Sequence, residues 1–236
     1  MRRITLTTNA QAILWVTLGT ALFSLLYASA KFGAGAASVF QILLLRYVSG
    51  LVSLLVVAAA KRRPLRTYRS ERPFSHLLRA VFGVSGGLSL IHASAAMPIV
   101  DATAIGLLYV VFVIPLGVLV LKETVGLRHG VGIALCCLGA AVVVGSRGVF
   151  TSFEPAYLRP AGIAVVGAAL LAIEGLMIRV LANADRPLTV LLHVNVFGIF
   201  LMAVPAALAW QPISVANAAP FLLLGPIVVM AQYCIV

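Results

Sequence analysis

The sequence predicts an all-α protein that crosses a membrane several times. Its 236 residues are 62% hydrophobic and only 10% charged, whereas a soluble domain has about 45–50% apolar and about 25% charged residues. The apolar residues form long runs between short polar breaks, and each run can cross a hydrocarbon core of ~30 Å as an α-helix. A spanning β-barrel is disfavoured, because its strands would be only ~10 residues long and would alternate in polarity.

Eight apolar runs define the predicted spans, at residues 11–30, 38–60, 76–95, 99–121, 128–145, 160–181, 188–210 and 219–236. The first run begins like a signal peptide, but no cleavage site with a soluble domain follows it, so we interpret it as a span. The cysteines Cys136, Cys137 and Cys234 lie inside spans and lack the spacing of a zinc site or of a disulfide framework. No nucleotide-binding fingerprint occurs either. We therefore expect no metal and no cofactor.

The basic residues concentrate in alternate connections between the spans, which is the pattern of the positive-inside rule. Connection 61–72 holds six of them, and Arg79 follows just inside the next span. We therefore expect this connection and the N-terminus to face the cytoplasm, in a multi-pass protein of the cytoplasmic (inner) membrane. The net charge of +11 then reflects topology, and no nucleic-acid partner is expected.

An internal repeat is visible when residues 19–31 are aligned with residues 167–179. In each segment a helix rich in small residues ends in a basic residue twelve positions after a glycine. Five spans separate the two starts, so the copies are predicted to be inverted, as in many carriers. The first repeat (1–150) would have five spans and the second (151–236) only three. We expect a natural fold of ten spans, of which this chain lacks the C-terminal part.

The stretch 76–145 carries a resemblance to a known family. It contains a small-residue turn around Pro98, a mid-membrane proline at Pro115, the sequence Leu121-Lys122-Glu123 and a glycine-rich helix around Gly132 and Gly139. This pattern resembles that of EamA-like permeases of the drug/metabolite transporter superfamily. Lys122 stands where the family usually has glycine. The resemblance covers nearly the whole chain, is sharpest over 97–145, and implies transport of small metabolites.

Glu174 is the strongest candidate for a functional side chain. It lies deep inside the sixth span, whereas the other five acidic residues fall in connections or at span ends. A charge at that depth costs roughly 2.5–3.5 kcal/mol on insertion scales, so it should face a cavity or a partner. We expect it to bind a proton or a cation, and the repeat alignment gives Leu26 as its counterpart. A structural ion pair is the alternative.

Five further residues are candidates for lining a substrate site. Arg46 lies inside the second span and could reach the membrane surface, bind an anionic substrate or pair with Glu174. Hydrogen-bonded packing is the alternative for His92 and His193, and core packing is the alternative for Tyr27 and Tyr109. Glycine pairs 83/87 and 126/130 have the GxxxG spacing of closely packed helices.

These observations predict a secondary carrier or exporter of small metabolites, such as amino acids or related compounds, and not an enzyme. The expected partners are a small-molecule substrate and the lipid bilayer, with the proton as a candidate coupling ion and a homodimer as a candidate assembly. Two alternatives stay open. The chain could be a non-transporting membrane protein, such as a scaffold or a lipid-modifying enzyme, or an inactive truncated permease.

Overall fold

The computed structural model describes residues 8–32, 36–62, 64–122, 126–145 and 155–235, and these residues contain helices but no strand. The α-helices are α1 (Thr8–Phe32), α2 (Val39–Ala60), α3 (Pro73–Ala96), α4 (Ile99–Gly106), α5 (Tyr109–Leu121), α6 (Leu127–Gly145), α7 (Pro155–Ala182), α8 (Pro187–Leu208) and α9 (Val215–Ile235). A short 3₁₀ helix, η1 (Leu65–Tyr68), lies between α2 and α3. The predicted all-α class is confirmed.

The helices have the length and surface of membrane spans. Six segments of the described chain are long and apolar enough to cross a bilayer, and α4 and α5 together form one of them. The remaining predicted spans coincide with α1 and α6. Large apolar side chains are exposed on outward faces, among them Leu119, Phe200 and Leu208. Such a surface is stable in contact with lipid, because hydrocarbon solvates it. The protein is therefore a polytopic helical membrane protein.

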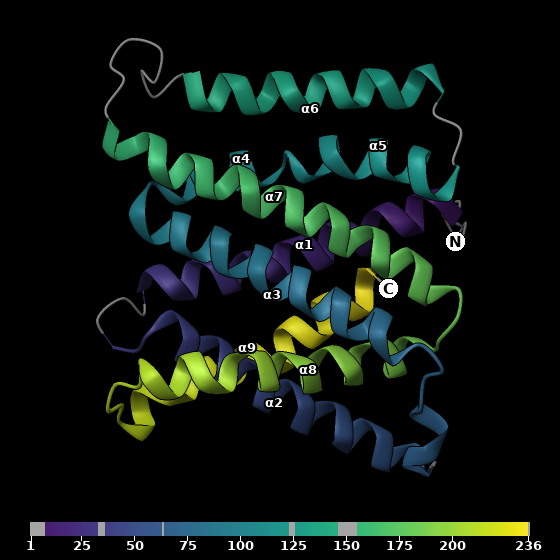
Figure 1. Cartoon of the computed structure of the whole chain (residues 1–236), viewed down its shortest axis with the longest axis vertical. Coiled ribbons are helices and arrows are strands. Elements are labelled where there is room, and N and C mark those ends of the chain that lie inside the picture. The colour runs from purple at the N-terminus through teal and green to yellow at the C-terminus, as the bar shows by residue number, and fades with distance from the viewer. Residues whose placement is uncertain (1–7, 33–35, 63, 123–125, 146–154, 236) are drawn as a thin grey trace, which may run out of the picture.

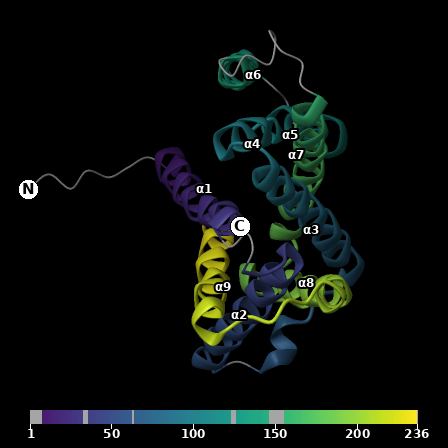
Figure 2. The same ribbon diagram turned by 90° about the vertical axis from the view of Figure 1, so that its left-hand side faces the viewer.

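The helices are arranged around a central group formed by α1, α2, α3, α7, α8 and α9 (Figures 1 and 2). Within this group α3 packs on α7 and α8, and α9 packs on α1 and α2. On one side, α4 and α5 pack on α7, and α6 lies outermost against α4 and α5 (Figure 2). The apolar core is built from α1, α2, α3, α8 and α9, with Leu43, Ile91 and Val228 among its buried side chains.

The packing follows the predicted repeat. If α1, α2 and α3 correspond to α7, α8 and α9, then the α3–α7 contact corresponds to α9–α1. The α2–α9 contact corresponds in the same way to α8–α3, and α2–α8 corresponds to itself; all five contacts are present. Figure 1 shows α1 and α7 running in opposite directions. These contacts support the inverted repeat, whereas the division into a complete and an incomplete unit stays a prediction.

The fourth predicted span, 99–121, is divided into α4 and α5. The division lies at Leu107 and Leu108, where N–H groups bond to carbonyls three residues back: Leu108 N to Ile105 O (3.0 Å) and Val110 N to Leu107 O (3.1 Å). The chain tightens there without reversing, since both residues keep right-handed helical backbones. The mid-membrane Pro115 lies inside α5 and does not mark the break.

Lys122 ends α5 in the left-handed conformation, with φ 55° and ψ 33°. A residue with this backbone commonly terminates a helix, and glycine adopts it at the lowest cost because it has no Cβ. The structure thus gives a physical reason for the glycine that EamA-like sequences usually carry at this position. Glu123, which follows it in the motif, lies outside the described residues.

One end of the molecule carries the predicted cytoplasmic elements. The start of α1, η1, the end of α5, the start of α6 and the connection from α7 to α8 all lie at the right of Figure 1. At the opposite end, Gln41 joins the start of α2 to the connection after α8. Its side-chain amide donates to the Gln211 carbonyl (3.0 Å) and accepts from the Gln211 N–H (3.2 Å). Successive connections thus alternate between the two ends, in agreement with the predicted topology. Which end faces the cytoplasm stays a prediction.

A cysteine at position 67 tests that orientation. Thr67 is exposed in η1, so Thr67→Cys, made after Cys136, Cys137 and Cys234 are replaced by serine, should react with an impermeant maleimide. We expect labelling in inside-out vesicles and none in intact cells, because the cluster of basic residues holds this connection in the cytoplasm. Labelling in intact cells would reverse the topology.

Candidate functional site

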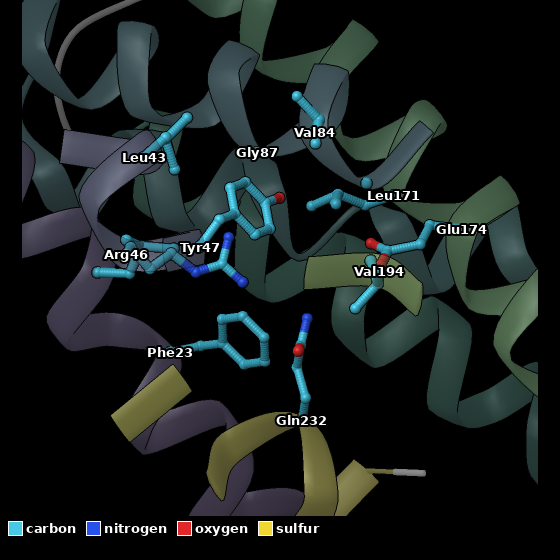
Figure 3. A pocket seen from close by; sticks show the side chains of 12 residues that line it. Phe23, Leu43, Arg46, Tyr47, Val84, Gly87, Leu171, Glu174, Val194 and Gln232 are labelled. Atoms are coloured by element: carbon cyan, nitrogen blue, oxygen red, sulfur yellow. The ribbon is translucent and has the colours of Figure 1, made fainter. Parts of the chain in front are cut away.

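A small cavity lies in the middle of the bundle, between α1, α2, α3, α7, α8 and α9 (Figure 3). Its volume is ≈ 50 Å³, enough for a few water molecules but far below the roughly 300–1,000 Å³ of pockets that hold drug-sized ligands. Apolar side chains form much of its wall, and Arg46, Glu174 and Gln232 bring polar groups to it. A ligand larger than water can therefore enter only if helices move apart.

Equivalent positions of the two predicted repeats face each other across this cavity. Residues 19–31 and 167–179 are offset by 148 positions, and the same offset relates lining residues on all six helices. The related lining pairs are Phe23 with Leu171, Leu26 with Glu174, Arg46 with Val194, and Val84 with Gln232. In three of the four pairs one member is apolar and the other polar, so the cavity is symmetric in backbone but asymmetric in chemistry.

The same offset relates two close contacts beside the cavity. Gly50 of α2 lies against the Asn195 side chain of α8, where an added Cβ would meet Oδ1 at 2.6 Å. Its counterpart Gly198 lies against the ring of Tyr47, which is the counterpart of Asn195. The two contacts at the crossing of α2 and α8 thus use equivalent positions of the two repeats, which again supports the repeat.

Glu174 lines the cavity and is paired with a residue that the sequence did not indicate as its partner. The Nε atom of Arg79 lies 3.7 Å from Glu174 Oε1, and the Arg79 side chain is fully buried. Arg79 also donates from Nη1 to the Val190 carbonyl (3.3 Å), while its Nε and Nη2 have no hydrogen-bond partner among the described residues. The carboxylate fits against α3 because Gly83 leaves room for it.

Arg46 points into the bundle, not toward the membrane surface. The residue is 5% exposed, and its guanidinium carbon lies 4.1 Å from the centre of the Tyr47 ring. Figure 3 shows the guanidinium between the rings of Tyr47 and Phe23. Such stacking over an aromatic face stabilises a cation. Among the described residues, the ion-pair partner of Glu174 is Arg79 and not Arg46, whose pairing with Glu174 was one of three alternatives.

The other candidate residues lie away from the cavity lining. His92 is exposed and lines a separate apolar pocket of ≈ 410 Å³ at the end of the bundle opposite η1. Tyr109 is half-buried at the start of α5, and His193 stacks on His76. The side chain of Tyr27 lies outside the described residues. The structure therefore brings together Arg46 and Glu174 from the predicted set.

The glycines with GxxxG spacing differ in whether they lie at a helix contact. Gly83 and Gly86 form the close contact of α3 with α7, and Gly86 and Gly167 approach each other's backbones, with an added Cβ meeting the opposite carbonyl at 3.1 Å. Gly87, Gly126 and Gly130 face open space. The prediction of close packing is thus right for Gly83 and wrong for the other three. Gly83 and Gly86 are three residues apart and therefore lie on one face of α3, which packs on α7.

Sequence reasoning missed three residues at the site: Arg79, Tyr47 and Gln232. Arg79 follows the basic connection 61–72 just inside the next span and counts there only as a topology signal, although it lies three residues after His76, on the same face of an apolar helix. Gln232 is a buried amide inside the last span, and its Oε1 has no hydrogen-bond partner among the described residues. A polar residue at that depth was a signal that could have been read in the same way as Glu174.

Six apolar helices around a small cavity with buried charges define a multi-pass membrane protein with an internal polar site. Comparison with known proteins adds the family. The model of the EamA-like transporter family matches residues 10–145, so the chain belongs to this family. A solved crystal structure, titled only as that of a protein, is similar to it with a TM-score of 0.72 and 20% identity, over 95% of this chain and 78% of the other. None of the curated proteins matches.

Proposed function

We propose that the protein is a secondary carrier or exporter of small metabolites with a carboxylate group, such as amino acids, across the cytoplasmic membrane. The supporting observation is the charge balance of the cavity. Arg46 and Arg79 bring two positive charges and Glu174 one negative charge to the same region of the bundle. A buried charge without compensation is costly. A substrate carboxylate would supply the missing negative charge.

The side chains of Glu174 and Gln232 are suited to bind the amino group of an amino acid. The Gln232 Oε1 atom has no hydrogen-bond partner among the described residues, and the Gln232 side chain extends toward the cavity (Figure 3). A carboxylate and an amide oxygen both accept hydrogen bonds from an amino group. We infer that the substrate places its carboxylate toward Arg46 and its amino group toward Glu174 and Gln232.

The small volume of the cavity implies movement during transport. Because ≈ 50 Å³ is too little for such a substrate, the bundle must open for loading. In a repeat structure this opening is a rocking of one unit against the other about the central site. Glu174 is our candidate for the proton-binding group, and the proton as coupling ion and a homodimeric assembly are further parts of this proposal.

Transport by the purified protein tests the proposal. In proteoliposomes with an imposed pH gradient, a panel of amino acids and related compounds should include at least one that the full chain moves. Protein-free liposomes provide the background. The absence of transport across a broad panel, from folded protein, would contradict the carrier and favour the scaffold.

Replacing Gln232 by leucine separates binding from stability. Because its Oε1 has no partner, the change should leave the thermal unfolding midpoint unchanged or raise it. Transport should fall by roughly tenfold or more, since a hydrogen bond to a charged group contributes about 1.5–3 kcal/mol. Met230→Leu, at an exposed position of the same helix, is the matched control. Undiminished transport in Gln232→Leu would remove this residue from the site.

A further inference from the structure

A second polar cluster lies at the end of the bundle that carries η1. Its members come from segments far apart in the sequence: Ser70 before α3, His76 in the first turn of α3, Asp185 between α7 and α8, and His193 in α8. The Ser70 hydroxyl donates to Asp185 Oδ2 (2.6 Å), and His76 Nε2 donates to the same oxygen (2.9 Å). Asp185 thus ties the start of α3 to the connection between α7 and α8.

The two histidine rings of this cluster are in contact. His76 and His193 are stacked, with ring centroids 4.4 Å apart and planes inclined by 20°. His193 donates from Nδ1 to the Thr189 carbonyl (2.8 Å). His76 is fully buried, and its Nδ1 has no hydrogen-bond partner among the described residues. A second proton on His76 would have to sit on this Nδ1, where the present packing offers no acceptor.

The cluster connects the surface with the cavity. The Asp185 side chain is 14% exposed, so protons from solution can reach it. Burial alone would raise the pKa of Asp185, but hydrogen bonds from Ser70 and His76 outweigh burial and hold that pKa below its ordinary value. The carboxylate therefore stays charged. One turn along α3 from His76 lies Arg79, which is paired with Glu174 at the cavity.

The charges that act on His76 come from each packed element. Asp185 provides the negative charge, His193 of α8 provides a second titratable ring, and Arg79 of α3 provides a fixed positive charge. The α7 helix contributes Glu174, which already pairs with Arg79, and Arg179 and Arg186 at this end are exposed. η1 contributes the buried Tyr68 hydroxyl. Asp185 thus acts on both imidazoles, and Arg79 adds a positive charge that acts on His76.

We propose that His76, His193 and Asp185 form a second proton-binding site, separate from Glu174, and that its protonation separates the two stacked rings and so loosens α3 from α8 at this end of the bundle. Protonation of His76 adds a positive charge near Arg79 and makes its Nδ1 atom a donor without an acceptor. Both changes favour separation of the His76 ring from the His193 ring. Separation of α3 from α8 at this end would widen the small cavity toward the side that η1 faces. Its role in gating rests on the proposed carrier function, but proton binding itself can be measured without transport.

Histidine NMR of the purified full chain tests the site directly. With ring-labelled histidine, signals are assigned from single His→Gln variants and followed from pH 5 to 8. We expect His76 to change protonation in this range, and His193→Gln to move its midpoint. Asp185→Asn should move the His76 midpoint to lower pH by about 1 unit or more, because the carboxylate that favours the charged ring is gone. The signal of the exposed His92, which lies outside the cluster, should be the same in both variants as in the unchanged protein.

Two results would overturn the site: a His76 signal that keeps one protonation state from pH 5 to 8, or a midpoint that Asp185→Asn leaves in place. If Asp185→Asn does not insert, Ser70→Ala replaces it. Loss of that hydroxyl strengthens the carboxylate as an acceptor and should move the His76 midpoint to higher pH. In proteoliposomes His76→Gln should flatten the pH profile of transport, and His92→Gln should keep it. Absence of transport in every sample contradicts the carrier and leaves the NMR result standing.

Discussion

Replacing Glu174 by glutamine should destabilise the bundle by about 3–5 kcal/mol, because it leaves the fully buried Arg79 without its counter-charge. A guanidinium cannot give up its proton to relieve the cost. Arg79→Met should cost less, since the remaining carboxylate can neutralise itself by taking up a proton. The double variant should regain most of the lost stability, because removing both charges costs less than breaking the pair.

Chemical denaturation of the four purified proteins measures this cycle. The coupling between the two substitutions should be large and favourable, whereas Glu174→Gln combined with Arg46→Met should recover less, since Arg46 does not form the ion pair. If the stability losses of Glu174→Gln and Arg79→Met simply add in the double variant, the ion pair is contradicted. The double variant should regain stability without regaining proton-coupled transport, because the proton-binding group is absent.

Gly225→Ala should be the most damaging small substitution, since it separates α9 from α2. An added Cβ would press on the Ser49 hydroxyl and on the backbone nitrogen of Gly50, and would lie 2.7 Å from the Arg46 carbonyl. Backbone atoms cannot turn aside as a side chain does, so the helices must move apart. Overpacking of this kind costs typically about 1–3 kcal/mol, and we expect the upper end or more.

Gly162→Ala is the control for this effect. Gly162 also lies in a spanning helix, and an added Cβ there meets no atom within 4 Å, so its unfolding midpoint should not fall. Gly225→Ala should also weaken transport more than its stability loss explains, because the displaced α2 backbone carries Arg46. Equal stability of the two variants would contradict the close contact of α2 with α9.

The fold could be predicted largely because hydrophobic length is a strong signal. Each of the eight predicted spans coincides with a helix or, for 99–121, with a pair of helices. The ends were less certain: α7 begins at Pro155 and not at residue 160, with Pro160 inside it. The break between α4 and α5 directly follows Gly106, a poor helix former, but a single glycine inside an apolar run does not by itself distinguish a break from a continuous span.

The site was harder to predict because burial near a helix end depends on packing. Arg46 and Glu174 stood out as charges deep in apolar runs, and both line the cavity. Arg79 and His76 lie within two turns of the start of α3, where a charge can reach water on an isolated helix. They are buried only because α7 and α8 cover that face. The pairing of Glu174 with Arg79 therefore required the arrangement of three helices.

Protection of a single cysteine in the cavity tests directly whether the substrate binds there. Gly87 lines the cavity, and an added Cβ there meets no atom within 4 Å, so Gly87→Cys can be introduced with serine at the three native cysteine positions. Gly162→Cys serves as the control outside the cavity. In a protein that still transports, the transported amino acid at saturating concentration should slow the labelling of Gly87→Cys by a small maleimide and leave Gly162→Cys unaffected. An unchanged labelling rate at Gly87→Cys would place substrate binding elsewhere.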